Sequence, residues 1–359
     1  MTDFPSERGV STVIDVALAL LLISASVMIV GYYLATTADE SPVDSHGHET
    51  TGAGQTHGGE SLSATHMTDV LSESTISVTY SIEDIRDEDE FSEPVITNDN
   101  TYSRTDHGSP LGLLADAAVM NYQIDGESVL AYSDAYEETV DWSIRENLVG
   151  TEQDFYIVAE WEPYDNATIN GTATAGTQPP ANADVSSTST TVSSGFSPID
   201  DAHFEDYQID DNESSAVTAT VIGEEIVDGF FPPESSQYAL EDQGINREQT
   251  VYQYQSMAGA VGEFSFRSPD THPPLTRTEA NAQAANRNLL VGQEGGYDAT
   301  DADAFGAWLA SDLEDAFESE FEELDDNDDE TDRDEKQLEA ILDETSTDTV
   351  TITIQTWNE

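Results

Sequence analysis

The chain contains no cysteine and very few basic residues. Its 359 residues include 10 Lys and Arg against 74 Asp and Glu, which gives a formal net charge of −64. The absence of cysteine excludes a disulfide framework, a thiolate metal site and a thiol nucleophile. The shortage of basic side chains makes nucleic acid and anionic headgroups poor partners for the surface, so we expect no nucleic acid partner.

The common sequence motifs of catalysis are also missing. There is no Gly-x-Ser-x-Gly elbow, no His-Glu-x-x-His, no phosphate loop and no dinucleotide fingerprint. One stretch, from Asp301 to Asp312, partly matches a calcium loop, but Phe305 stands where a fifth-position oxygen ligand is needed. The sequence therefore predicts no catalytic residue, no metal site and no cofactor, and it identifies no small-molecule ligand.

The excess of acids predicts a salt-rich environment. Self-repulsion of so many carboxylates destabilises a compact state. At about 1 M salt the Debye length falls to about 3 Å and the repulsion is screened. A halophilic archaeal source is the natural inference. An acidic disordered chain is the alternative, but strand and helix periodicities persist along most of the sequence.

One long apolar run lies near the N-terminus. It extends over the 19 residues from Val16 to Leu34, and only Ser24 and Ser26 interrupt it with polar groups. As a helix it would measure roughly 28 Å, close to the ~30 Å hydrocarbon core of a bilayer. Because the apolar core of a secretory signal has only about 7–15 residues, we predict a transmembrane helix over residues 13–35 rather than a signal cleaved after Ala38.

The residues on either side of this helix predict its orientation. The flank before it, residues 1–12, is short and carries Arg8, whereas the residues after it carry nearly all of the acids. Short basic flanks stay in the cytoplasm. We therefore predict a single-pass protein of the cell membrane, with its N-terminus cytoplasmic, its C-terminal domain extracellular and membrane lipid as a partner.

The start of the chain resembles the class III signal of archaeal type IV pilins. Arg8-Gly9 is followed by Val-Ser-Thr-Val and then by the hydrophobic helix. The resemblance implies that a prepilin peptidase cuts between Gly9 and Val10 and leaves the helix on the mature chain. Asp15 would be the sixth mature residue, near the glutamate, usually fifth, with which bacterial pilins neutralise a neighbour's amine. An acid in a membrane segment is a functional candidate, although Asp15 can also reach headgroup water.

The whole layout resembles uncharacterised haloarchaeal membrane proteins associated with pilus or secretion-type systems. This resemblance implies a role in surface assembly, with other pilin-like subunits as partners through the transmembrane helix, and it supplies no catalytic residue. Two other interpretations stay open. One is a membrane-anchored extracellular hydrolase, which would need a cleft with converging polar groups and an acid of shifted pKa. The other is a structural or adhesive cell-surface protein with a plain signal anchor.

Beyond the membrane helix, the sequence predicts a stalk and one α+β domain. Residues 39–68 are rich in Gly, Ser, Thr and His, which is typical of a flexible tether. Residues 70–359 carry both strand and helix periodicities and form the predicted acidic extracellular domain. Within it, residues 172–197 are rich in Ser, Thr and Pro and are predicted to be a surface loop.

Side-chain periodicity predicts the elements of this domain. Alternation of apolar and polar residues predicts strands over 76–82, 217–221 and 350–354, and the run over 155–161 predicts a buried strand. Apolar residues three and four apart predict helices over 109–122, 134–150, 276–292, 305–324 and 338–342. Ser109, Asp134 and Thr276 are the expected N-terminal residues of the first three helices, with Glu137 completing a capping box.

Three triplets match the acceptor pattern for N-linked glycans. They begin at Asn166, Asn170 and Asn212 and lie in or beside the predicted loop. An exported, loop-rich setting favours glycosylation of such triplets. These asparagines are therefore candidate modification sites.

Overall fold

The computed structural model describes residues 64–89, 91–94, 98, 100–148, 154–199, 203, 214–262, 281–292, 304–317, 336–337 and 340–358. The predicted membrane helix, Gly9, Val10, Asp15 and Asn212 lie outside these residues. The chain divides into two units, Met1–Gly58 and Gly59–Glu359, and every described residue belongs to the second. Within the described ranges, each helix is too short or too polar to cross a bilayer.

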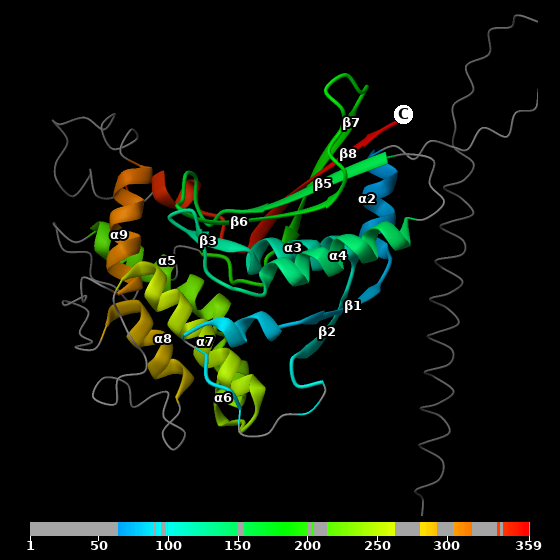
Figure 1. Ribbon diagram of the computed structural model, residues 1–359. Helices are drawn as coiled ribbons and strands as arrows, with labels where there is room; N and C mark the ends of the chain where they lie inside the picture. Colours follow the sequence, from blue (N-terminus) through cyan, green and yellow to red (C-terminus); the bar gives the residue numbers. More distant parts are fainter. Residues whose placement is uncertain are drawn as a thin grey trace, which may run out of the picture. The chain divides into compact units, whose positions relative to one another are not determined.

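The second unit is built on a six-stranded antiparallel sheet in the order β4-β3-β6-β5-β8-β7 (Figure 1). Its strands are β3 (Tyr122–Ile124), β4 (Glu127–Ser128), β5 (Asp154–Trp161), β6 (Ile169–Gly176), β7 (Ser186–Ser193) and β8 (Thr349–Trp357). The C-terminal strand β8 lies between β5 and β7 and places Ile354 opposite Ile157. Both side chains are fully buried, so the last strand completes the core.

Two helices cover the inner face of this sheet. They are α3 (Pro110–Met120) and α4 (Ser133–Asn147). A two-stranded antiparallel sheet of β1 (Ile76–Ser81) and β2 (Ser103–Gly108) lies on the other side of α4 (Figure 1). The ring of Tyr80 in β1 meets the ring of Tyr136 in α4 edge-on, with centroids 4.7 Å apart. The helix α2 (Ala64–Glu73) packs near β7 and β8, and the 3-10 helix η1 (Glu83–Asp87) follows β1.

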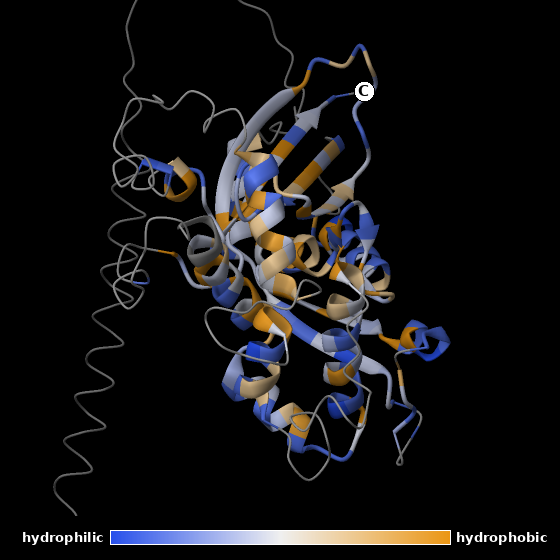
Figure 2. Cartoon of the chain, turned by 90° about the vertical axis from the view of Figure 1, so that its left-hand side faces the viewer, coloured by the Kyte–Doolittle hydropathy of each residue, from blue (hydrophilic) through white to orange (hydrophobic). Residues whose placement is uncertain are grey.

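Five further helices form a cluster beside the sheet. They are α5 (Ser214–Phe230), α6 (Pro233–Glu241), α7 (Ile245–Val261), α8 (Ala282–Val291) and α9 (Phe305–Ala316). Several of the described helices contain both hydrophobic and hydrophilic residues (Figure 2). Phe230 joins α5 to the sheet, since its ring centroid lies 4.3 Å from that of Tyr122, 5.0 Å from Phe196 and 5.7 Å from Trp161.

The predicted α+β class and many of the predicted elements are confirmed. The helix α3 begins after Ser109, whose hydroxyl accepts the Gly112 N–H at 3.0 Å as predicted for an N-cap. The predicted helix over 134–150 is α4, and the strands predicted over 76–82, 155–161 and 350–354 are β1, β5 and β8. Residues 340–343 are helical, within the predicted range 338–342 and one residue beyond it.

The strand predicted over 217–221 was wrong, because these residues lie in α5. The run is rich in Val and Thr, which favour strands. However, Ala219, Ile222 and Ile226 step by three and four along the helix and are all fully buried. Packing of this stripe against α8 and α9 outweighs the local preference.

The surface loop predicted over 172–197 was also wrong. Ala173 and Ala175 are buried in the second half of β6, and residues 186–193 form the whole of β7. Threonine is β-branched and suits a strand once a partner strand is present. The predicted stalk over 39–68 ends too late, since α2 begins at Ala64 and Met67 is fully buried.

Three helix boundaries also differ from the prediction. The helix α4 follows Tyr132, which makes no side-chain cap, so the capping box at Asp134 was wrong. The helix α8 is capped by Asn281, whose side chain accepts the Ala284 N–H at 3.0 Å, rather than by Thr276. The helix α9 ends at Ala316, which is shorter than the predicted 305–324.

Candidate functional site

A groove lies where helix α9 meets the turn between β5 and β6. Its cavity measures about 480 Å³ and is lined by Asp125, Asn166, Thr168, Trp308, Ser311, Asp312, Asp315 and Ala316. We refer to it as the Asp312 groove. It brings the β3–β4 turn, the β5–β6 turn and α9 to one place, although these segments are far apart in the sequence.

Asp312 is the buried acid of this groove. The residue is only 7% exposed. Its Oδ2 accepts hydrogen bonds from the Tyr164 hydroxyl at 2.5 Å and from the Thr168 N–H at 3.1 Å. Its Oδ1 accepts the Thr168 hydroxyl at 2.6 Å. A buried carboxylate is tolerated only when hydrogen bonds replace its lost hydration. Asp312 therefore joins α9 to the β5–β6 turn.

Tyr164 is the matching donor. Burial, and then the neighbouring Asp312 carboxylate, raise the pKa of the Tyr164 phenol well above its ordinary value. The phenol consequently keeps its proton and donates to Asp312. Three of the roughly four lone-pair sites of the Asp312 carboxylate are occupied by these donors. The Asp312 carboxylate therefore serves as a hydrogen-bond acceptor that holds the structure together.

Two residues at the groove have left-handed backbones. Asp125 has a φ of 52° and Asn166 has a φ of 62°, and among the described residues no other non-glycine residue has a positive φ. Asp125 and Gly126 form the two-residue turn of the β3–β4 hairpin, a turn type that requires positive φ at both positions. The hairpin therefore accounts for Asp125. Asn166 adopts αL more readily than most residues, and it lies on the exposed side of the β5–β6 turn.

The rim of the groove combines an indole ring with oxygen acceptors. The Trp308 Nε1–H donates to Asp125 Oδ2 at 3.2 Å, and Trp308 itself is half-buried against Phe305, with ring centroids 5.5 Å apart. Asp315 and Ser311 are exposed on the adjacent turns of α9. Such a rim can accept hydrogen bonds from a ligand rich in hydroxyl or ammonium groups.

The predicted glycosylation sites differ in their settings. Asn166 is exposed at the rim of the Asp312 groove, so a glycan there would lie over the groove. Asn170 is half-buried in β6, and its Nδ2 donates to the Ala167 carbonyl at 3.1 Å. Asn212 lies outside the described residues. Of the two asparagines that the structure describes, Asn166 is the more accessible acceptor.

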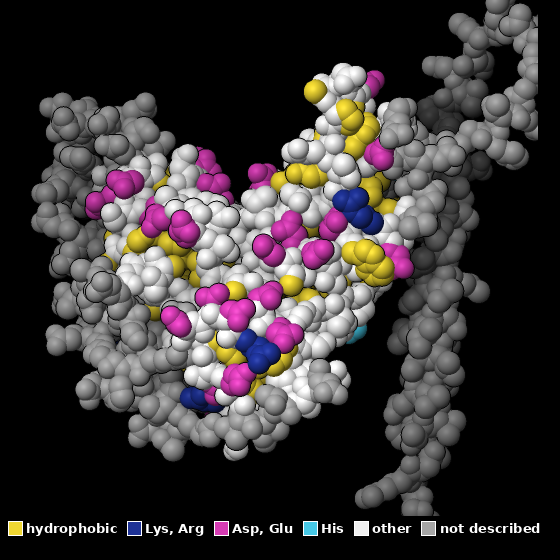
Figure 3. Space-filling model, in the orientation of Figure 1, with side chains coloured by type: hydrophobic (Ala, Val, Ile, Leu, Met, Phe, Trp, Pro, Cys, Tyr) yellow, Lys and Arg dark blue, Asp and Glu magenta, His cyan; other side chains and the backbone are white. Residues whose placement is uncertain are grey.

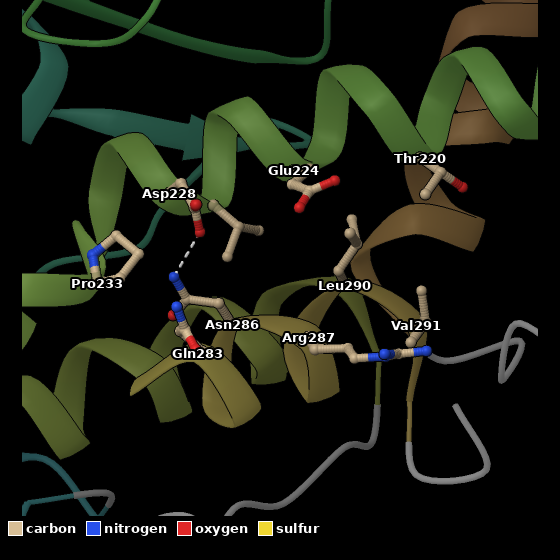
Figure 4. A pocket seen from close by; sticks show the side chains of 10 residues that line it. Thr220, Glu224, Asp228, Pro233, Gln283, Asn286, Arg287, Leu290 and Val291 are labelled. Atoms are coloured by element: carbon tan, nitrogen blue, oxygen red, sulfur yellow. Dashed lines mark hydrogen bonds between the residues drawn. The ribbon is translucent and has the colours of Figure 1, made fainter. Parts of the chain in front are cut away.

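A second pocket lies between α5 and α8. It has a volume of about 230 Å³ and is lined by Thr220, Glu224, Val227, Asp228, Pro233, Gln283, Asn286, Arg287, Leu290 and Val291 (Figure 4). We refer to it as the α5–α8 pocket. Figure 4 shows the Glu224 and Asp228 carboxylates on the side of α5 that faces α8, with the Arg287 side chain running along α8 toward Val291.

Asn286 holds Asp228 in place within this pocket. The Asn286 Nδ2 donates to Asp228 Oδ1 at 2.6 Å and to the Phe231 carbonyl at 2.8 Å, while Asn286 Oδ1 accepts the Tyr254 hydroxyl. Burial raises the pKa of Asp228, and the hydrogen bond from Asn286 opposes this in part. A carboxyl of raised pKa is the type of group that general acid–base chemistry uses.

No set of residues suited to a metal ion occurs in the described part of the chain. In particular, these residues form no cluster of three or more His, Cys, Asp or Glu side chains that could hold one. The helix predicted through the partial calcium match is confirmed from Phe305 onward, with Phe305 fully buried and Asp312 held by Tyr164 and Thr168. Asp301 and Asp303, the first residues of that match, lie outside the described residues.

Residues 14–357 match DUF7284, a family of unknown function. The chain belongs to this family. No curated protein and no solved structure matches the chain. The DUF7284 match begins before the apolar run and extends to the end of β8. The apolar run and the α+β unit are therefore parts of one family pattern.

Sequence patterns found the members of the Asp312 groove separately and did not bring them together. Thr168 was predicted as part of a glycosylation triplet and Asp312 as the last position of a partial calcium loop, and the two are 144 residues apart. Tyr164 and Asp228 were not predicted to have partners. Glu137 was predicted to cap its own helix, but its carboxylate accepts hydrogen bonds from Asn121 and Thr174 instead. One signal was available in the sequence. Asp312 lies next to Leu313 on the apolar side of the helix that also carries Phe305 and Leu309. An acid on the buried side of a helix needs hydrogen-bond donors to replace its hydration.

Proposed function

We propose that this DUF7284 chain is a membrane-anchored surface protein of a halophilic archaeon, pilin-like, with a non-catalytic role in a type IV pilus or secretion-type assembly. The observation that carries the proposal is the apolar run from Val16 to Leu34, which falls within the same family match as the α+β unit. A run of this length fits the hydrocarbon core of a bilayer. The acidic unit after it would lie outside the cell.

The residues before the run support processing by a pilin-type peptidase. Gly9 presents no Cβ before the scissile bond, and Arg8 keeps that bond at the cytoplasmic face. A cut after Gly9 would create a positive amine on Val10. That amine could pair with the Asp15 carboxylate of its own or a neighbouring chain, a partly desolvated contact that favours lateral association of helices.

The Asp312 groove supports the non-catalytic part of the proposal. Its buried acid accepts three hydrogen bonds that connect α9 to the β5–β6 turn. The groove rim offers an aromatic face and acceptors, which is a composition suited to binding rather than to bond cleavage. Its ligand class would be rich in hydroxyl or ammonium groups.

N-terminal sequencing of the protein extracted from membranes tests the proposal. A start at Val10 supports pilin-type processing, whereas an intact Met1 or Thr2 supports a structural or adhesive protein with a plain signal anchor. A start at Asp39 would mean that the apolar run is only a discarded export signal. Gly9→Val should leave a longer protein in the membrane, and Asp15→Ala should weaken assembly without releasing the protein.

Protease treatment of intact cells tests the orientation. If the α+β unit lies outside, added protease should remove it while a cytoplasmic marker stays intact. Full protection of the unit in intact cells, with digestion after lysis, would overturn the proposed orientation.

An anchored hydrolase is the second candidate, and the α5–α8 pocket is the observation that favours it. Asp228 has a raised pKa, and Glu224 lies one helical turn before it on the same side of α5 (Figure 4). Purified protein in multimolar KCl can be tested on chromogenic esters, peptides and glycosides. Turnover that is lost in Asp228→Asn and retained in Asp315→Asn would support a hydrolase over an assembly subunit.

A further inference from the structure

The strand β7 lies at an edge of the six-stranded sheet and lacks the usual protection of an edge. It has eight residues and, among the described strands, pairs only with β8. Its sequence, Ser-Ser-Thr-Ser-Thr-Thr-Val-Ser, contains no charged residue, no proline and no glycine. Natural edge strands are commonly kept short, or carry charges, prolines or bulges, because a free edge can pair with another chain. The opposite edge strand, β4, has only two residues.

The other exposed edge in this sheet is capped by side chains. The strand β3 pairs with β6 only at residues 169–171, which leaves the second half of β6 without a strand on that side. There, Glu137 Oε1 accepts the Thr174 N–H at 2.8 Å, and Asp141 Oδ1 accepts the Gly176 N–H at 2.7 Å. The Asn121 Nδ2 donates to the Thr172 carbonyl at 3.0 Å. The fold thus protects the β6 edge with acids of α4, whereas no side chain in the described part of the chain caps the outer edge of β7 in this way.

The segments that contain β7 and its partner strand β8 are nearly free of charge. Residues 172–197 contain a single charged side chain, Asp184, and β8 contains none, although 23% of all residues in the chain are charged. Figure 3 shows the projecting end of the sheet as mostly neutral and apolar atoms, whereas acids are frequent over the rest of the visible face. Two copies of this chain repel each other over most of their surfaces. Few carboxylates of these two segments would face each other if two copies met along the β7 edge.

We infer that β7 pairs in antiparallel fashion with β7 of a second copy of the chain, so that the sheet continues from one molecule into the next. A second copy fits because its β7 brings an equally uncharged strand, whereas a basic partner would be drawn to the acidic surface elsewhere. The pairing would place Ser and Thr opposite Ser and Thr. The β7–β8 pair already shows this chemistry, since the Ser189 and Thr353 hydroxyls hydrogen bond at 3.0 Å.

This contact is independent of the membrane anchor and of processing at Gly9. Antiparallel pairing of identical strands creates a two-fold axis perpendicular to the sheet, and the residue on that axis lies opposite its own copy. A residue two positions away from the axis is separated from its copy by four residue steps, about 13 Å along the strands. The inferred contact therefore predicts that only one position of β7 lies close to the same position in the second copy.

The absence of cysteine from the chain allows a direct test. Single-cysteine variants at each position from Ser187 to Val192 are made in the full chain, purified in detergent at multimolar KCl and exposed to a mild oxidant. A disulfide needs Cα atoms about 4.4–6.8 Å apart. We expect one variant to form dimers at least ten-fold faster than Ser77→Cys, an exposed control in β1. Equal rates at all positions, or rates no higher than the control, would overturn the inference.

Added charge provides the second arm of the test. In the fastest cysteine variant, two of the changes Ser187→Glu, Ser189→Glu and Thr191→Glu are introduced at exposed positions of β7 other than the cysteine. Like charges facing each other across the strands should slow dimer formation at least ten-fold. The matched control carries Ser77→Glu and Gln123→Glu, which add the same charge on exposed positions of β1 and β3 and should leave the rate unchanged. An unchanged rate in the β7 variant, with its circular dichroism intact, would also overturn the inference.

Discussion

Replacing Asp312 by alanine should destabilise the α+β unit strongly. The change removes three acceptor contacts, to the Tyr164 hydroxyl, the Thr168 hydroxyl and the Thr168 N–H, at a site that is only 7% exposed. Hydrogen bonds to a charged group contribute about 1.5–3 kcal/mol each, and donors left unsatisfied in a buried site add a further penalty. Alanine carries no charge to desolvate, and removing the desolvation cost of the carboxylate offsets part of this loss of stability. We expect Asp312→Ala to cost about 3–5 kcal/mol of unfolding free energy, because three donors lose their charged acceptor at a buried site.

A double-mutant cycle with Tyr164→Phe separates this link from general packing. Tyr164→Phe alone removes one charged hydrogen bond and should cost about 1.5–3 kcal/mol. In the Asp312→Ala background the same change should cost much less, giving a coupling energy of about 1–3 kcal/mol. Urea unfolding at fixed multimolar KCl, followed by circular dichroism, measures all four proteins.

Asp315→Ala is the matched control for this cycle. Asp315 is exposed one turn away on the same helix and should change stability by no more than about 0.5 kcal/mol. If Asp312→Ala costs no more than Asp315→Ala, or if the costs of Asp312→Ala and Tyr164→Phe simply add, the proposed link between α9 and the β5–β6 turn is wrong.

Three further predictions concern a close backbone approach, an acid and salt. A Cβ on Gly171 would lie 2.0 Å from the Ala118 carbonyl oxygen, so Gly171→Ala should lower the free energy of unfolding by about 1–3 kcal/mol or more. Gly259 in α7 has open space where a Cβ would lie, so Gly259→Ala should raise the free energy of unfolding by about 0.5–1 kcal/mol. Urea unfolding measures both changes. Burial raises the pKa of Asp228, so its contribution to stability is greatest below its unfolded pKa of about 3.9 and is lost as the pH rises through its folded pKa. Asp228→Asn should therefore raise the melting temperature at pH 7 but not at pH 3.5, and a difference that is the same at both would contradict this. Because the chain carries a net charge of −64, its melting temperature should rise steeply between low and multimolar KCl, and a midpoint indifferent to salt would remove the halophile argument.

The elements that could be predicted from sequence are those whose burial follows a simple period. In α4, Tyr136, Val140 and Ile144 step by four residues and are all buried, and in β8 Val350, Ile352 and Ile354 alternate and are all buried. Such patterns identify an element and its inner face together. They say nothing of neighbours, so the place of β8 between β5 and β7 could not be read from its own residues.

The elements that were missed depend on contacts made far along the chain. The strand β7 has no apolar alternation except at Val192, and it forms because β8, more than 150 residues later, supplies a partner across its whole length. The helix α5 has a strand-like composition at Val217, and only its packing against α8 and α9 favours a helix. Local propensity loses to tertiary contacts in both cases.

The candidate sites were hidden for a related reason. With 74 acids in the chain, the presence of an acid at one position carries almost no information. What distinguishes Asp312, Glu137 and Asp141 is the set of donors around each carboxylate. Those sets include donors 148 residues from Asp312, 37 residues from Glu137 and 35 residues from Asp141. An acid on an otherwise apolar helical stripe, as at Asp312, was the one local signal available.

In a chain where 23% of residues are charged, the uncharged stretches carry the information that the acids do not. Carboxylates suit a surface that faces water, because there they remain hydrated and keep molecules apart. A long stretch without them is a candidate for a contact with something other than water. The run from Val16 to Leu34 is long enough to face lipid. The β7–β8 pair is too polar for lipid, yet it offers a free row of backbone donors and acceptors along β7. A second uncharged strand would satisfy that row, so we propose different contacts for these two uncharged segments, the membrane for the apolar run and another copy of the chain for β7.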